Sequence, residues 1–226
     1  MTKNRIKYKP KYPEFDNLLG RKSFLIILSK VTSAGLAFIG LFFISRYLGA
    51  EIYGTVSYSM ALVVTFNVVA NLGYDAAHAK RISEGKNLND CLSTFMVTKL
   101  TLTAVMVVVV LASLGVWTIV LGNELGRASL EIIGLFILFE VFVNISRIAL
   151  QTFDARVETA KTQIATLMEP LIRVPVVVLV SLNRMDAVHL AYAYLLGGAA
   201  TAVVALLLLS RDRIEWRKPT LFKNYT

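Results

Sequence analysis

Six apolar segments, each long enough to cross a membrane as a helix, constrain the fold of this chain more than any other feature of its sequence. A helix rises about 1.5 Å per residue, so ~20 apolar residues cross the ~30 Å hydrocarbon core of a bilayer. The chain is 56% hydrophobic and only 17% charged, whereas soluble domains contain about 25% charged residues. We therefore expect an all-α, polytopic membrane protein. Its predicted transmembrane helices span residues 24–46, 53–79, 95–121, 130–151, 160–182 and 187–210.

The basic residues lie mostly at the ends of these segments, and this distribution predicts the orientation. An amino terminus in the cytoplasm places 17 of the 24 Lys and Arg residues on the cytoplasmic side and three on the other, as the positive-inside rule requires. The net charge of +9 could indicate nucleic acid, but clusters at segment ends form no continuous basic surface, so we expect no such partner. We expect a basic cytosolic arm (1–22), a six-helix transmembrane lobe (23–210) and a basic cytosolic tail (211–226).

The three connections on the outer side are short, so neighbouring helices are expected to pack antiparallel. In the last segment Gly197, Thr201 and Ala205 recur every four residues. Small residues at this spacing let helix backbones approach closely in lipid. We expect this face to form a helix contact.

Polar side chains inside three of the apolar segments recur at intervals of three or four residues. Such intervals place side chains on one face of a helix, and polar groups deep in a membrane usually face partners or a wet cavity. The sequence therefore predicts three helices that line a central aqueous cavity. The three polar stripes are Asn67, Asn71 and Asp75; Glu140, Asn144, Arg147 and Gln151; and Thr162, Thr166, Glu169 and Arg173.

A simpler interpretation applies to Glu169 and Arg173, which are four residues apart and could form an ion pair that only locks the bundle. Pro170 and Pro175 bracket Arg173. Each proline removes a backbone donor and tends to bend a helix. A bent, charged helix that faces a cavity would suit the moving part of an alternating-access transporter.

Other polar residues in the segments receive less specific interpretations. We expect Lys99, about one turn from a helix end, to extend to the interface, whereas Lys30 lies nearly two turns deep. His78 is expected to cap the cytoplasmic end of its helix, His189 lies near the opposite face, and Cys91 has no second cysteine as a partner. The sequence lacks a nucleophile elbow, a Walker A loop and a metal-binding His/Cys set. We therefore expect no enzyme activity, no cofactor and no metal.

The stretch Ser45–Glu84 resembles the first two membrane spans of prokaryotic oligosaccharide flippases of the O-antigen type, the polysaccharide-transporter branch of the MATE-like superfamily. The most specific matches are Arg46-Tyr47-Leu48-Gly49, Tyr53-Gly54, Leu72-Gly73 and Lys80-Arg81-Ile82-Ser83-Glu84. The resemblance implies one MATE-like lobe of a transporter that moves a polyprenyl-phosphate-linked or polyprenyl-pyrophosphate-linked sugar across the cytoplasmic membrane. Family members usually have two such lobes, so the resemblance also implies a second lobe, as a homodimer, a separate subunit or a missing carboxy-terminal half.

We therefore hypothesise that the chain helps to flip a lipid-linked oligosaccharide, for cell-surface polysaccharide or glycoprotein synthesis, by alternating access. The candidate residues are Lys30, Arg147 and Arg173 for the lipid phosphate, Asn67, Asn71 and Asn144 for the sugar, and Asp75, Glu140 and Glu169 for an energising ion. One alternative is a cation-coupled exporter of drugs or metabolites, favoured if the carboxylates dominate the cavity. Another is a non-transporting scaffold or inactive lobe, favoured if the polar stripes neutralise one another.

Overall fold

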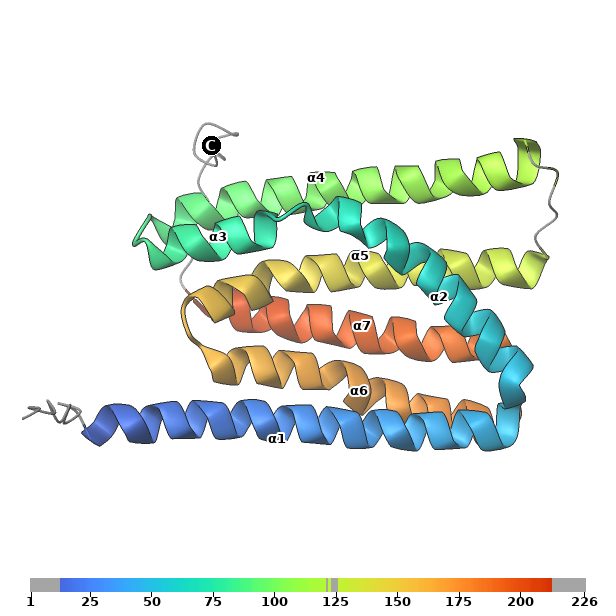
Figure 1. Cartoon of the computed structure of the whole chain (residues 1–226), viewed down its shortest axis with the longest axis horizontal. Coiled ribbons are helices and arrows are strands. Elements are labelled where there is room, and N and C mark those ends of the chain that lie inside the picture. Colours follow the sequence, from blue (N-terminus) through green and yellow to red (C-terminus); the bar gives the residue numbers. More distant parts are fainter. Residues whose placement is uncertain (1–12, 121, 123–125, 213–226) are drawn as a thin grey trace, which may run out of the picture.

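The computed structural model describes residues 13–120, 122 and 126–212, and its described elements are all helical (Figure 1). In chain order they are α1 (Pro13–Phe43), the short π-helix η1 (Ile44–Leu48), α2 (Gly49–Asn71), α3 (Tyr74–Ser83), α4 (Leu88–Gly115), the π-helix η2 (Val116–Val120), α5 (Arg127–Ala155), α6 (Thr159–Leu182) and α7 (Ala187–Ser210). α6 and α7 have 24 residues each. Each is therefore ~36 Å long, enough to cross the ~30 Å hydrocarbon core.

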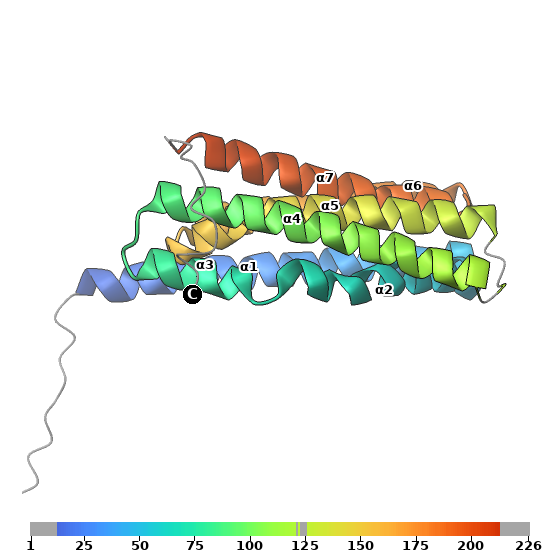
Figure 2. The same cartoon turned by 90° about the horizontal axis from the view of Figure 1, so that it is seen from above.

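The helices form an elongated bundle, in which α1 begins and α7 ends at the same end (Figure 1). Figure 2 shows from a second direction that most of the helices run roughly along the long axis of the bundle, whereas Figure 1 shows α2 crossing it obliquely. Five continuous stretches are long and apolar enough to cross a membrane. The first, Gly20–Asn71, contains most of α1 together with η1 and α2. The chain turns back at η1, so this stretch supplies two helices of opposite direction (Figure 1). The prediction of an all-α, polytopic membrane protein is confirmed.

Two helices begin earlier than hydropathy predicts. α1 starts at Pro13, inside the expected cytosolic arm, rather than at residue 24, and proline suits the first helical position because its missing N–H is not needed there. α4 starts at Leu88 rather than at residue 95, because the side chain of Asn87 accepts hydrogen bonds from the backbone N–H groups of Asn89 and Asp90. Hydropathy indicates the part of a helix that lies in the membrane, so it does not predict these polar extensions.

The second predicted helix, residues 53–79, is two helices rather than one. α2 ends at Asn71 and α3 begins at Tyr74, and the two residues between them have left-handed backbone conformations. Gly73 has a φ of 80°, which glycine adopts without steric cost, whereas Leu72 has a φ of 33°, which is uncommon for a residue with a side chain. The expectation of a continuous helix is wrong, because the Leu72–Gly73 pair interrupts it.

α5 lies at the centre of the bundle and packs against α2, α3, α4, α6 and α7. Its buried aromatic residues belong to two apolar clusters. Phe136 lies in the cluster that includes Val63 of α2 and Leu190 of α7, and Phe153 lies in the cluster that includes Phe95 of α4. α5 is therefore the helix against which most of the other helices are positioned.

Two adjacent glycines let α7 approach both α5 and α6. A Cβ atom on Gly197 would lie 2.8 Å from the backbone oxygen of Glu169 on α6. A Cβ atom on Gly198 would lie 2.7 Å from the ring of Phe139 on α5. The predicted contact face of α7 is confirmed, because all three of its small residues are buried.

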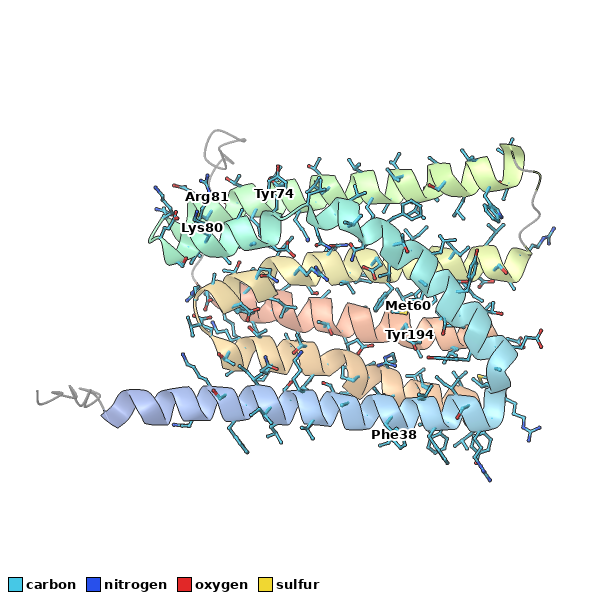
Figure 3. All side chains as sticks on the ribbon, in the orientation of Figure 1. Phe38, Met60, Tyr74, Lys80, Arg81 and Tyr194 are labelled. Carbon is cyan, nitrogen blue, oxygen red and sulfur yellow. The ribbon has the colours of Figure 1, made fainter. Side chains whose placement is uncertain are left out.

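α1 lies at the edge of the bundle and packs chiefly against α6. Much of its remaining surface is apolar and exposed, including Phe24, Ile27, Val31 and Phe38. Figure 3 shows Phe38 pointing away from the other helices. A large exposed apolar surface on a membrane-spanning helix meets lipid or another membrane-embedded element.

Candidate functional site

Two of the three predicted polar stripes meet where α2 and α3 pack against α5, and they form two adjoining groups of side chains. The inner cluster consists of Asn67, Glu140 and Asn144. The outer cluster consists of Asn71, Asp75, Lys99 and Arg147, and Lys99 comes from α4.

The inner cluster is a buried chain of hydrogen bonds. Asn144 Nδ2 donates to Asn67 Oδ1 at 2.9 Å, and Asn67 Nδ2 donates to Glu140 Oε2 at 2.7 Å. Asn144 Nδ2 also donates to the backbone oxygen of Glu140 at 2.9 Å, which holds this amide against its own helix. The Glu140 residue is 4% exposed and Asn144 is 0% exposed. Direct contacts between helices, rather than an open hollow, therefore surround these three side chains.

The outer cluster is ionic and joins both sides of the helix break. Lys99 Nζ donates to Asn71 Oδ1 at 2.6 Å and to Asp75 Oδ1 at 2.9 Å. Arg147 Nη1 donates to Asn71 Oδ1 at 3.0 Å and to Asp75 Oδ2 at 3.4 Å. Asn71 is the last residue of α2 and Asp75 is the second residue of α3, so the two cations hold α2 and α3 in a fixed relation.

The outer cluster has an excess of positive charge, because two cations share one carboxylate. The side chain of Lys99 is 0% exposed, whereas that of Arg147 is 35% exposed and that of Asp75 is 19% exposed. A guanidinium has donors on three nitrogens, and within the described structure Arg147 uses Nη1 for its hydrogen bonds. Its remaining donors are therefore free to bind an anionic group.

The expectation that Lys99 extends to the membrane interface is wrong. Its side chain is fully buried between α4, the α2–α3 break and α5. Two oxygen acceptors in the interior satisfy the ammonium, so it gains nothing by reaching the headgroups. A carboxylate at a similar depth, Asp75, is the reason that the charge stays inside.

The third polar stripe does not join these clusters. Arg173 Nε donates to Glu169, and its guanidinium lies 4.8 Å from the ring centroid of Tyr194 on α7. The ion pair between Glu169 and Arg173, which the sequence suggested as a simple lock for the bundle, is therefore present. α6 continues as a helix through Pro170 and Pro175.

The two remaining predictions concern Lys30 and His78. Lys30 lies on α1, is exposed and forms no ion pair with a described residue. His78 is not an exposed cap, because it is fully buried, its Nε2 lies 3.0 Å from Thr152 Oγ1, and its ring stacks on Phe95. These partners lie on α4 and α5, so no local sequence pattern indicates them.

Lys99 and Tyr194 complete these groups, although neither is a predicted site residue. For Lys99 a signal existed, because Asp75 deep in one span requires a cation and Lys99 lies at a similar depth in the next span. For Tyr194 the sequence carries none, since the residues around it are apolar. Figure 3 shows Tyr194 and Met60 towards the middle of the bundle, away from Lys80 and Arg81 at the far end of α3.

A groove of about 230 Å³ lies between α2 and the segment formed by the end of α4 and η2. It is mainly apolar and is lined by Tyr58, Leu62, Phe66, Ser113, Leu114 and Trp117. None of these is a predicted site residue. Within the described ranges, no three His, Cys, Asp or Glu side chains are grouped so that they could hold a metal ion.

Known proteins resemble this chain along most of its length. The model of a family described as "Polysaccharide biosynthesis protein" matches residues 19–225. The chain is 26% identical over 206 residues to the probable low-salt glycan biosynthesis flippase Agl15 of Haloferax volcanii. That match covers 91% of this chain but 41% of the relative, so the chain spans less than half the length of the protein it matches. No solved structure matches the chain.

Proposed function

This chain belongs to the polysaccharide biosynthesis protein family, and we propose that it forms one lobe of a flippase that moves a lipid-linked oligosaccharide across the cytoplasmic membrane. The printed name of the relative Agl15, a probable flippase of glycan biosynthesis, supports this activity. We assign residues 23–210 to the lobe, residues 1–22 to a cytosolic arm and residues 211–226 to a cytosolic tail, of which residues 1–12 and 213–226 lie outside the described part of the chain. The substrate is a sugar linked to polyprenyl phosphate or pyrophosphate.

The observation that carries this proposal is the partly exposed side chain of Arg147 among membrane-spanning helices. A charged side chain within the membrane is costly unless it contacts a binding partner or water. Asn71 and Asp75 hold the group in place through Nη1, and the outer cluster has one positive charge in excess. A guanidinium binds phosphate through charge-assisted, often bidentate hydrogen bonds. Arg147 therefore receives the lipid phosphate.

The exposure of the other predicted site residues decides which part of the substrate each one is proposed to contact. Lys30, exposed on α1, and Arg173, half-buried on α6, supply further positive charge along the path of the phosphate. Asn71 is half-buried beside Arg147 and contacts the sugar. Asn67 and Asn144 are enclosed by the inner cluster, so they reach the sugar only after α2 and α5 separate. An energising ion uses Asp75, Glu140 or Glu169.

The proposed mechanism is alternating access between this lobe and a second one. The exposed apolar surface of α1 supports this proposal, because a helix that packs chiefly on α6 leaves room for another lobe or for lipid. The second lobe is a second copy, a separate subunit or another part of a longer chain. The distribution of Lys and Arg supports cytoplasmic termini, with the connections between α3 and α4 and between α5 and α6 on the same side.

A non-transporting scaffold is the second candidate, and a specific observation favours it. The inner cluster and Asp75 bond directly to their neighbours, so most of two polar stripes is satisfied inside the lobe. A scaffold needs these contacts for rigidity and has no use for the free donors of Arg147. Replacement of Arg147 therefore separates the two functions.

The test is Arg147→Gln in the complete transporter, assayed in cells by accumulation of unflipped lipid-linked oligosaccharide. Loss of a charge-assisted bond to a buried phosphate costs at least ~1.4 kcal/mol, which predicts about a tenfold fall in flipping. Arg147→Lys keeps the charge and restores part of the activity, although an ammonium lacks the planar fork.

The matched control is Arg127→Gln at the exposed start of α5, which should leave flipping unchanged. Protein abundance and melting temperature are measured for every variant, because Arg147 also contacts Asp75. If Arg147→Gln folds normally and flips at the wild-type rate, Arg147 is not in the substrate path and the scaffold function gains support.

A further inference from the structure

Glu140 differs from the other two carboxylates deep in the bundle, because it has no cationic partner. Asp75 and Glu169 each form an ion pair with a Lys or Arg side chain. Among the described residues, no Lys, Arg or His nitrogen lies within 4.0 Å of the Glu140 carboxylate. Its side-chain hydrogen bond comes from the neutral amide of Asn67.

At the buried position of Glu140, a carboxylate without a counter-charge is energetically unfavourable. The residue is 4% exposed and lies near the middle of α5. A carboxylate removed from water without a counter-charge costs several kcal/mol, and one neutral amide donor does not offset this. A proton on the carboxyl removes the charge and leaves the hydrogen bond from Asn67 intact.

The charged groups on the surrounding helices are already engaged with one another. Arg147 lies seven residues further along α5 than Glu140, ~10 Å along the helix axis. It bonds to Asn71 and Asp75, as does Lys99 of α4. On α6 the pair Glu169 and Arg173 is internal, and α7 contains no Lys, Arg, Asp or Glu. In the described part of the neighbouring helices, no side chain therefore supplies the missing cation.

The inner cluster also contains an acceptor that lacks a donor. Asn144 Oδ1 is buried and has no hydrogen-bond partner among the described residues, although the Nδ2 of the same amide donates twice. Asn144 lies one turn after Glu140 on the same face of α5. A protonated carboxyl gains an O–H donor, and a buried acceptor without a partner costs about 1–3 kcal/mol. A proton on Glu140 would satisfy both side chains.

We propose that Glu140 is a proton-binding site, and that its O–H group donates to Asn144 Oδ1 in the state seen here. The proton comes from water and returns to water, so the exchange needs no other reactant. Asn71 Nδ2 donates to the backbone oxygen of Asn67 at 3.0 Å, so the outer cluster adjoins the inner one. The partly exposed side chains of Asp75 and Arg147 then complete the proposed polar route for exchange. That the proton energises flipping rests on the proposed function, whereas the binding of the proton does not.

The binding is tested by infrared spectroscopy of the purified full chain in lipid nanodiscs, with 13C-labelled glutamate. The expected result is a C=O band of a protonated glutamic acid at neutral pH that shifts in D2O and is absent from Glu140→Gln. Glu169→Gln is the matched control and should retain the band, because Glu169 forms an ion pair with Arg173, whereas Glu140 has no cationic partner among the described residues. A wild-type spectrum without such a band overturns the proposal, as does a band that persists in a folded Glu140→Gln variant.

A second variant covers the case in which Glu140→Gln does not fold. Asn144→Leu removes the acceptor but keeps the carboxyl, so the band should remain and move to higher frequency as its O–H loses a partner. An unmoved band shows that Asn144 is not the acceptor and overturns that assignment.

The coupling is tested separately in inverted membrane vesicles that contain the complete transporter. Collapse of the pH gradient should slow flipping by the wild type but not by Glu140→Gln. If collapse of the pH gradient slows flipping equally in the wild type and in Glu140→Gln, the proposal that the Glu140 proton energises flipping is wrong. If the infrared band is present while Arg147→Gln flips normally, the proposed function fails and proton binding stands.

Discussion

Lys99 shows how a single buried side chain can hold two helices together. Its ammonium binds Asn71 before the break and Asp75 after it, so it stabilises one angle between α2 and α3. The backbone at the break is left-handed at Leu72 and Gly73. The Leu72 N–H bonds back to Val68 of α2, and the Gly73 carbonyl accepts from Ala77 of α3, so each residue belongs to its own helix and the contacts of Lys99 join the two. Lys99 is therefore a positioning residue for Asp75, and through Asp75 for Arg147.

We predict that Lys99→Met destabilises the lobe by about 3 kcal/mol. The substitution removes one partner of a buried ion pair and leaves Asp75 with Arg147 alone, and such changes typically cost ~3–5 kcal/mol. The measurement is thermal unfolding of the purified protein in detergent.

Lys80→Met on α3 is the control, because the Lys80 side chain is 76% exposed and its ion pair with Glu84 is weak. Equal melting temperatures for the two variants would show that Lys99 does not stabilise the break.

At the scale of elements, two glycines position α7, because neither has a side chain that would hold α7 away from its neighbours. Gly197 and Gly198 lie side by side in sequence, and each removes a Cβ that would collide with a neighbouring helix. The first permits contact with α6 at the level of Glu169 and Arg173, so it also places Tyr194 under the guanidinium. Packing of α7 and the geometry of the third stripe therefore depend on the same residue.

We predict that Gly197→Ala destabilises the bundle by about 1–3 kcal/mol, the usual cost of inserting a methyl group into a packed contact. The new Cβ would meet the backbone of Glu169 at 2.8 Å, and a backbone atom cannot rotate away. The melting temperature should fall in detergent.

Gly35→Ala is the matched control, because a Cβ on Gly35 meets nothing within 4 Å. That change should be neutral or slightly stabilising, since alanine favours the helix. A neutral Gly197→Ala would mean that α6 and α7 approach each other less closely than described.

At the scale of the whole molecule, a network of charges stabilises the end of the bundle where α1 begins and α7 ends. Asp212, just after α7, accepts hydrogen bonds from Arg156 at 2.6 Å and from Lys161 at 2.8 Å. Glu158 pairs with the same two cations, and Lys22 of α1 donates to the Val157 carbonyl at 3.0 Å. The α5–α6 connection thereby joins α1, α5, α6 and the end of α7.

The Asp212 carboxylate makes this network dependent on pH. Burial raises its pKa, but hydrogen bonds from Lys161 and Arg156 and their charges outweigh burial, and the pKa falls below its ordinary value. A folded-state pKa below the unfolded value contributes stability that is present above the unfolded pKa and is lost as pH falls through the folded pKa.

We predict that Asp212→Asn lowers the melting temperature at neutral pH and that the difference from wild type shrinks as the solution is acidified. The measurement is the melting temperature of both proteins from neutral pH to below the ordinary carboxyl pKa. A gap that stays constant with pH would contradict the assigned role of the carboxylate.

Much of this architecture could be predicted from the sequence, because the signals are local. The length of each apolar run predicts a helix that crosses the membrane. Intervals of three and four residues predict that Glu140, Asn144 and Arg147 lie on one face of a helix. The break after Asn71 was missed because hydropathy continues across Leu72 and Gly73, although glycine permits a left-handed backbone there. The polar starts of α1 and α4 were missed for the related reason that hydropathy does not follow helices out of the membrane.

The sequence by itself determined the fold class, the number of membrane segments and the polar stripes, because each depends on residues within a few turns of one another. Only the tertiary structure decided which stripes meet. Asn67 and Glu140 are 73 residues apart, and Asp75 and Arg147 are 72 apart, so their contacts depend on how α2, α3 and α5 pack. The same packing places two cations beside Asp75, whereas Glu140 accepts its side-chain hydrogen bond from the neutral amide of Asn67. In the sequence, both residues are single carboxylates in apolar surroundings.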